Sequence, residues 1–249
     1  MLFRSRDADH LVEIGVETHI CVSTPATNHV PPTTNYAIIV AGGSGSRMKS
    51  AVPKQFLLLN GKPILQHTIE RFLAFSDALT LILVLPQRDM ATWAALCDKH
   101  SFYPAIQTVT GGQTRFQSVK NGLRAIKVTD GLVAVHDGVR PFVTTEIIQN
   151  SFDTAVQTGS AVTCVPAKDS VRLVSETGQN QAVDRASVRL IQTPQTFRLD
   201  WLRTAFDADE QPHFTDCASV LEHAGFPITL IEGSYENIKI TTPEDLRGL

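Results

Sequence analysis

The sequence predicts an α/β protein of three layers, in which helices cover both faces of a mostly parallel β-sheet and a β-hairpin arm projects from that sheet. Two observations support this prediction. Short, almost continuous apolar runs alternate along the chain with longer segments whose apolar residues recur at helical spacing. Between residues 166 and 190 the alternation stops, and two short extended stretches flank a polar turn at Gly178.

The alternating elements begin at Tyr36. The run 36–41 ends at two glycines, as expected of a strand buried on both faces, and residues 63–75 place apolar side chains on one helical face after Pro63. The elements expected next are a strand at 79–85, a helix at 88–99, a strand at 106–110, a helix at 114–127, a strand at 132–136, a helix at 144–157 and a strand at 161–165. This order implies right-handed crossovers, so the loops after 41, 110, 136 and 165 converge where such sheets bind ligands.

Residues 1–35 differ from the rest of the chain. They end in a Pro/Thr-rich stretch at 31–34, and no sustained apolar region follows their basic start, which argues against a secretory signal. We expect a poorly ordered N-terminal extension over 1–35, in preference to a regulatory arm. Residues 36–249 are expected to form a single domain, with the hairpin arm at about 166–190.

The composition excludes several classes of protein. The chain has 249 residues with 22 Lys+Arg against 25 Asp+Glu, a net charge of −3, which argues against a nucleic-acid or anionic-membrane partner. No apolar run approaches the roughly 18 residues that span a bilayer. The four cysteines form no CxxC pair, so we expect free thiols in a reducing cytoplasm and no zinc cluster.

A glycine-rich loop, Gly42-Gly43-Ser44-Gly45-Ser46-Arg47-Met48, directly follows the first strand. Its backbone N–H groups can curl around phosphate oxygens. Met48 occupies the position where a dinucleotide fingerprint needs a third small residue, and the Gly-Lys-Ser/Thr of a P-loop is absent. Arg47 and Lys54 instead supply two cations beside the loop, which suits a nucleoside triphosphate. The alternative is an ordinary glycine-rich turn with solvated side chains.

A second polar cluster, His136-Asp137-Gly138-Val139-Arg140, ends the strand at 132–136. Asp137 is placed to hold a metal or a ribose, although an ion pair with Arg140 is an alternative. His136 is expected to be a packed residue, because no second histidine has ligand spacing. Later polar residues have simple structural explanations when taken singly: Thr215 as a helix cap and Lys239 as a solvated strand residue.

Taken together, these segments resemble one family, 2-C-methyl-D-erythritol 4-phosphate cytidylyltransferase, from Tyr36 to Leu249. The motifs that carry the resemblance are Ala41-Gly-Gly-Ser-Gly-Ser-Arg47-Met48, Pro53-Lys54-Gln55, His136-Asp137 with Arg140-Pro141, Asp169-Ser170, Val183-Asp184-Arg185, Thr193-Pro194-Gln195, Thr215-Asp216 with Ala218-Ser219, and Asn237-Ile-Lys239-Ile-Thr241. The resemblance implies a Rossmann-like nucleotidyltransferase fold. It also implies transfer of a cytidylyl group from CTP to 2-C-methyl-D-erythritol 4-phosphate, with release of pyrophosphate, in isoprenoid biosynthesis.

The resemblance also implies roles for individual residues. Arg47 and Lys54 match transition-state stabilisers, and Arg185 and Lys239 match residues that position the sugar phosphate. The residues implied for CTP are Ala41, Gly42, Gly43, Gly45, Gly111, Gly112, Gln113, Ser118, Asp137 and Arg140. Ser170, Arg185 and Thr215 are implied for the sugar phosphate, and Asp137 with Glu236 for Mg²⁺. The family resemblance further implies a homodimer joined through the arms, in which Ser170 and Arg185 serve the neighbouring subunit.

Some positions depart from the family pattern. Gln113 replaces a frequent Asp, Gly42 a common Ala, Ser46 a frequent Arg and Glu236 an Asp, and Cys217 stands where an acid is usual. The alternatives are a ribitol-5-phosphate cytidylyltransferase, which shares the glycine loop and the Asn-Ile-Lys-Ile segment, and a nucleotide-binding module without catalysis. A nicotinamide dehydrogenase is disfavoured by Met48. Val183-Asp184-Arg185 and Ala218-Ser219 favour methylerythritol phosphate over ribitol phosphate.

Overall fold

The computed structural model describes residues 34–42 and 52–246, which all belong to the second of two units into which the chain divides, Pro31–Leu249. Part of the N-terminal extension and of the glycine-rich loop, including Gly43, Gly45 and Arg47, therefore lies outside the described residues. Within the described ranges, none of the helices combines the length and apolar character that a bilayer crossing requires. Cys97, Cys164 and Cys217 are free thiols.

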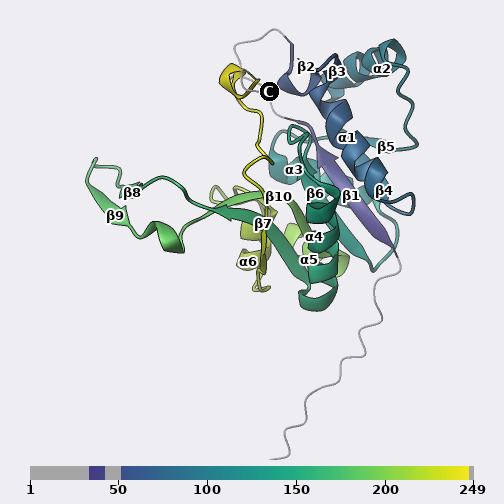
Figure 1. The fold of residues 1–249 in the computed structure, drawn as a ribbon. Coiled ribbons are helices and arrows are strands. Elements are labelled where there is room, and N and C mark those ends of the chain that lie inside the picture. Colours follow the sequence, from purple (N-terminus) through teal and green to yellow (C-terminus); the bar gives the residue numbers. More distant parts are fainter. Residues whose placement is uncertain (1–33, 43–51, 247–249) are drawn as a thin grey trace, which may run out of the picture. The chain divides into compact units, whose positions relative to one another are not determined.

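A seven-stranded sheet forms the centre of the unit, with strand order β11-β7-β10-β6-β1-β4-β5 (Figure 1). Its strands are β1 Asn35–Val40, β4 Thr80–Leu85, β5 Gln107–Thr110, β6 Leu132–Asp137, β7 Ser160–Pro166, β10 Arg189–Arg198 and β11 Leu230–Glu232. Strand β10 pairs antiparallel with both β6 and β7, whereas the other pairs are parallel. The predicted mostly parallel α/β sheet is confirmed.

Helices cover both faces of the sheet, which confirms the three layers. They are α1 Ile64–Phe75, α2 Met90–Lys99, α3 Arg115–Ala125, α4 Thr145–Thr158, α5 Leu199–Phe206 and α6 Cys217–His223. The side chains of β1 alternate between two separate cores. Ala37 and Ile39 pack with α1, α2 and α4, while Ile38 packs with α3, α5 and α6 on the other face. This alternation explains why the strand is an unbroken apolar run, since each side chain meets a helix layer.

Two small hairpins lie outside the central sheet. Strands β2 Leu58–Leu59 and β3 Lys62–Pro63 flank Asn60 and Gly61, both with positive φ, as a tight hairpin turn requires. Strands β8 Val171–Val174 and β9 Asn180–Val183 form the predicted arm, which extends from the sheet in Figure 1. Short 3₁₀ turns complete the unit: η2 Lys54–Phe56, η3 Gln87–Asp89, η4 Arg185–Ser187 and η5 Pro243–Leu246.

Strand β10 is the element that sequence patterning did not predict. It lies near the middle of the sheet, although it contains Pro194 and a register shift between Ile191 and Gln195. From Gln192 to Thr196 its polar side chains are buried, and Thr196 donates to Ser151, while Thr163 of the neighbouring β7 donates to the carbonyl of Pro194. Helix α5 and strand β11 were also not predicted, whereas α6 is the helix expected after Thr215. The cap of α6 is Asp216, not Thr215 as the sequence suggested, since the Asp216 carboxylate accepts the Ser219 N–H at 2.8 Å.

Candidate active site

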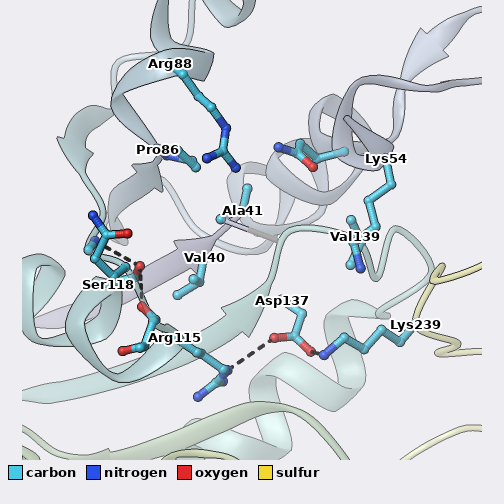
Figure 2. A pocket seen from close by; sticks show the side chains of 15 residues that line it. Val40, Ala41, Lys54, Pro86, Arg88, Arg115, Ser118, Asp137, Val139 and Lys239 are labelled. Atoms are coloured by element: carbon cyan, nitrogen blue, oxygen red, sulfur yellow. Dashed lines mark hydrogen bonds and ion pairs between the residues drawn. The ribbon is translucent and has the colours of Figure 1, made fainter. Parts of the chain in front are cut away.

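The strand ends converge on a cavity of about 520 Å³, as the topology predicts. It is lined by residues of β1, β6, η2, η3 and α3, by Pro86 after β4, by the loop between β5 and α3, and by the segment before η5. The lining residues are Val40, Ala41, Gly42, Lys54, Gln55, Pro86, Arg88, Gly112, Gln113, Thr114, Arg115, Ser118, Asp137, Val139 and Lys239 (Figure 2). Four of these side chains are cationic, and Asp137 is the sole carboxylate among them. The cavity is thus suited to a polyanion.

Asp137, the last residue of β6, is the centre of the charge arrangement. Its carboxylate lies 3.0 Å from Lys239 Nζ, 3.5 Å from Arg140 Nε and 3.7 Å from Arg115 Nε. Figure 2 shows Arg115 and Lys239 reaching it from opposite sides. Burial opposes ionisation of this carboxyl, but Arg115, Lys239 and Arg140 outweigh burial and hold its pKa well below the usual range. The local charge is therefore three cations against one anion.

A hydrogen-bond chain beneath Asp137 fixes the end of β6. The Asp137 N–H contacts Thr193 Oγ1 at 3.1 Å, Thr193 Oγ1 lies 3.1 Å from His136 Nδ1, and His136 Nε2 lies 3.3 Å from the Arg140 carbonyl. Because a backbone N–H can only donate and a carbonyl can only accept, Thr193 donates to Nδ1 and His136 carries its proton on Nε2. Burial lowers the pKa of His136 to about 3, so the ring is neutral. His136 is thus a packed residue, as predicted.

We expect the free energy of unfolding to fall as pH decreases from about 6.5 towards 3, by up to about 1.4 kcal/mol per pH unit from His136 alone. The pKa of His136 in the folded state lies below its value in the unfolded state. Between these two values the unfolded state alone binds a proton at His136, which favours unfolding. Urea titrations at several pH values, without nucleotide or Mg²⁺, measure the slope. His136→Gln serves as the comparison, and equal slopes for the two proteins would contradict this account of the ring.

The loop between β5 and α3 forms another wall of the cavity. Thr114 caps α3 by accepting the Gln117 N–H, and Ser118 Oγ accepts from Gly112 N at 3.1 Å while donating to the Thr114 carbonyl at 2.8 Å. A Cβ on Gly112 would lie 2.2 Å from Gln117 Cβ, so only glycine fits the close approach. These contacts hold the backbone at Gly112 and Gln113 in a fixed position facing the cavity.

Replacing Gly112 by alanine should displace this loop and weaken CTP binding at least tenfold, because the added methyl must move α3 or the loop. Gly42→Ala is the matched control. A Cβ at Gly42 would meet Ser118 Oγ at 3.7 Å, an ordinary contact, so this variant should bind CTP within about twofold of the parent. Calorimetric titration with CTP compares the two variants, and equal affinities would show that the loop position does not matter.

A second cavity of about 220 Å³ adjoins the first and shares Arg115, Asp137 and Lys239 with it. Its other lining residues are Arg140, Ile191, Gln192, Thr193, Gln195, Thr215 and Asp216. A residue in the wall between two cavities can contact molecules bound in both. The arrangement therefore provides for two ligands side by side, with cations at their junction.

The structure brings together most of the predicted site residues that it describes. Ala41, Gly42, Lys54, Gly112, Gln113, Ser118, Asp137 and Lys239 line the larger cavity, and Arg140 and Thr215 line the smaller one. Gly111 lies behind the wall, with its N–H on the Leu85 carbonyl. Lys239 is not a solvated strand residue, because its ammonium contacts Asp137. Gly43, Gly45 and Arg47 lie outside the described residues.

Besides Gly111, three predicted residues lie outside the walls of both cavities. Ser170 and Arg185 belong to the exposed arm, where Arg185 Nη1 donates to the Lys168 carbonyl at 3.0 Å. Glu236 is exposed on the surface and does not fit the predicted metal site. Asp137 does fit as a single carboxylate ligand, since Mg²⁺ in nucleotide sites is commonly held by one or two carboxylates plus substrate phosphates. No cluster of three potential metal ligands occurs within residues 34–42 and 52–246.

Sequence reasoning missed Arg115 and Arg88. Arg115 lies in the wall shared by the cavities, where it also donates to Cys217 Sγ at 3.2 Å. Burial raises the pKa of that thiol despite the neighbouring guanidinium, so Cys217 is a neutral partner. The signal for Arg115 was its place directly after the helix cap Thr114, at the start of a helix that follows a strand. That position alone does not distinguish it from a surface arginine.

An α/β sheet with a cation-lined cavity at the carboxyl ends of its strands is suited to binding a nucleotide, and solved structures with this fold are cytidylyltransferases, which places the chain in the nucleotidyltransferase class. Comparison with known proteins identifies the family. The model of the family described as 2-C-methyl-D-erythritol 4-phosphate cytidylyltransferase matches residues 36–248. The chain belongs to the 2-C-methyl-D-erythritol 4-phosphate cytidylyltransferase family, as its motifs predict.

Relatives and solved structures agree with this assignment. A protein of that name from Porphyromonas gingivalis is 51% identical over 213 residues, covering 85% of this chain and 94% of the relative. One from Bacteroides thetaiotaomicron is 47% identical over 210 residues, 84% and 95% of the two chains. The crystal structure of 4-diphosphocytidyl-2C-methyl-D-erythritol synthase from Anaerococcus prevotii matches with a TM-score of 0.73 at 28% identity, covering 86% of this chain and 92% of that one. The Francisella tularensis cytidylyltransferase matches with a TM-score of 0.68 at 31% identity, covering 87% and 98%.

Proposed function

We propose that this protein transfers the cytidylyl group of CTP to 2-C-methyl-D-erythritol 4-phosphate, giving 4-diphosphocytidyl-2-C-methyl-D-erythritol and pyrophosphate. The observation that carries the proposal is the pair of adjoining cavities with Arg115, Asp137 and Lys239 in their common wall. Family membership gives the identity of the two substrates. Neither ribitol phosphate transfer nor binding without catalysis is favoured by these relatives. We place the reaction in the cytoplasm, because the described cysteines are unpaired.

The reaction brings together two anions. A phosphate oxygen of the sugar phosphate attacks the α-phosphorus of CTP, the bond to the bridging oxygen breaks, and pyrophosphate leaves with that electron pair. The nucleophile is already ionised at neutral pH, so no general base is required. The barrier is repulsion between like charges, which Lys54 from η2 and Lys239 and Arg115 from the common wall reduce. Mg²⁺, when bound with Asp137, would neutralise further charge on the triphosphate.

The walls of the two cavities orient the substrates. We assign CTP to the larger cavity, where the backbone of Gly112 and the side chain of Ser118 are fixed by their mutual hydrogen bond. The sugar phosphate is assigned to the smaller cavity, beside Arg140 and Thr215. Arg140 is held there by donating to the Asn237 carbonyl at 2.7 Å. Holding both reactants in register supplies the remaining part of the rate enhancement.

We also propose that the arm completes the site of a second copy of the chain. Ser170 and Arg185 are exposed on the arm and lie outside both cavity walls of their own subunit. Leu173 and Val174 on β8 are 58% and 68% exposed, an apolar surface that a partner subunit would cover. A homodimer would therefore bury this surface and deliver Arg185 to the neighbouring sugar phosphate.

A substrate panel tests the reaction. Release of pyrophosphate is followed with CTP, UTP or ATP as donor, and with methylerythritol phosphate or ribitol 5-phosphate as acceptor. We expect turnover with CTP and methylerythritol phosphate. Preference for ribitol phosphate would replace the acceptor in the proposal, and CTP binding without any pyrophosphate release would favour a binding module.

Arg185→Ala should raise KM for methylerythritol phosphate by roughly tenfold or more and leave KM for CTP almost unchanged, since it removes a charged hydrogen bond to one substrate only. Steady-state kinetics with each substrate varied measures the two constants. Mixing Arg185→Ala with Lys54→Ala subunits tests whether the arm of one subunit completes the site of the other. If it does, one site of the mixed dimer contains both Lys54 and Arg185. Recovery of activity is expected, and no recovery would place Arg185 in the site of its own subunit.

A further inference from the structure

Arg88 lines the larger cavity but has no part in the mechanism above. It lies in η3, directly after β4, and its side chain is 65% exposed. Its Nε is 3.7 Å from the carboxylate of Asp89. Asp89 is itself buried and accepts a hydrogen bond from Gln55 Nε2 at 3.0 Å. The Nε edge of the Arg88 guanidinium thus lies beside a fixed carboxylate, while the rest of this exposed group remains accessible to a ligand.

The strand order shows which part of a nucleotide Arg88 faces. The cavity follows the consecutive strands β6, β1, β4 and β5. The reacting end lies at β6, with Asp137 and Lys239, so the nucleoside of CTP would occupy the opposite end, beside Gln113 in the loop after β5 and Ser118 in α3. Arg88 follows β4, the immediate neighbour of β5. In Figure 2 its guanidinium points into the cavity above Ala41, with Lys239 on the far side of Asp137. Arg88 therefore faces the nucleoside and not the reacting phosphates.

The side chain of Gln113, at the same end of the cavity, does not define which pyrimidine is bound. The amide of Gln113 contains both an acceptor and a donor, so by rotation it suits the 4-amino group of cytosine or the 4-carbonyl of uracil. A guanidinium can only donate. Cytosine presents two adjacent acceptors, N3 and O2, whereas N3 of uracil carries a hydrogen. A donor pair aimed at this edge therefore accepts cytosine and opposes uracil.

We propose that Arg88 is a specificity-determining residue that donates hydrogen bonds to N3 and O2 of the cytosine ring of CTP. The proposal rests on the proposed use of CTP by this site. Asp89 acts as the positioning residue that holds the arginine against the cavity wall. In this arrangement Arg88 distinguishes cytosine from uracil, whereas the amide of Gln113 can hydrogen-bond to either base.

Equilibrium binding of CTP and UTP, measured by calorimetry without acceptor, tests the proposal for the parent protein, Arg88→Met and Arg88→Gln. A bidentate contact to a base edge contributes roughly 10–100-fold discrimination, so both variants should lose that factor of preference for CTP, mainly through weaker CTP binding. Arg124→Met is the matched control. Arg124 is an exposed arginine on α3 that lines neither substrate cavity, and its loss should leave both affinities unchanged.

Two results would overturn the proposal: unchanged affinities for both CTP and UTP, or an equal loss of affinity for both nucleotides. The second result would indicate a contact to the phosphates, which CTP and UTP share. Because the measurement needs no turnover, its outcome is distinct from that of the pyrophosphate assay. A parent protein that prefers CTP but releases no pyrophosphate would contradict the proposed reaction and leave the role of Arg88 intact.

Discussion

Lys54→Ala lowers kcat by roughly 10²–10³-fold, the expected cost of losing one fixed cation at the reacting phosphates. Lys54 is 8% exposed in η2 and lines the larger cavity, so solvent would screen its charge beside a bound nucleotide less than it screens a surface lysine. The loss should fall on kcat more than on KM for CTP, because charge builds up most strongly in the transition state.

Pyrophosphate release under saturating substrates measures this effect, and circular dichroism verifies that the variant is folded. Lys99→Ala, at the exposed end of α2, is the matched lysine control and should retain full activity. Near-parental turnover by Lys54→Ala would remove Lys54 from the chemistry and leave Lys239 and Arg115 as the cations to examine.

Asp137→Asn should lower the free energy of unfolding by about 3–5 kcal/mol at pH 7, because it leaves three cations without their buried counter-charge. Arg140 and Asp137 are 9% and 10% exposed, so solvent screens their interaction poorly, although Lys239 at 37% is partly screened. The folded pKa of Asp137 is lowered, so its contribution is complete above about pH 4 and is lost as pH falls below that value.

Urea denaturation in chloride and in phosphate at equal ionic strength tests this prediction. Phosphate should stabilise Asp137→Asn more than it stabilises the parent, because an anion can replace the missing carboxylate among the cations. Asp200→Asn is the control. Its exposed ion pair with Arg198 should contribute at most about 1 kcal/mol. Equal losses in the two variants would show that Asp137 is not the centre of the charge arrangement.

The sequence predicts those elements whose apolar pattern matches their burial. Strands β1, β4 and β6 and helices α1, α3 and α4 appear within a few residues of their expected bounds. Strand β10 does not, because buried threonine and glutamine replace apolar side chains in it. Gln195, for example, donates to Asp216 at 2.8 Å and accepts from the N–H groups of Cys217 and Ala218. A buried polar residue whose hydrogen-bond partners lie on other helices or strands cannot be distinguished from a loop residue in the sequence alone.

Site residues could likewise be predicted from the sequence only where a local motif marks them. Lys54 and Lys239 were identified from motifs, and both line the larger cavity although neither lies at a strand end. Arg88 and Arg115 lie in no quoted motif and become visible only once neighbouring strands bring their loops together. Thr193 could be placed beneath Asp137 only when β10 was known to lie beside β6.

The position of β10 also constrains the order in which the sheet can assemble while the chain is being synthesised. Strands β6 and β7 are not neighbours in the finished sheet, since the later-synthesised β10 fills the space between them. During translation, the half of the sheet that contains β1, β4, β5 and β6 cannot join β7 until residue 198 has left the ribosome. A nascent chain stalled before that point would expose the edges of both halves, which makes it a substrate for chaperones or a template for aggregation.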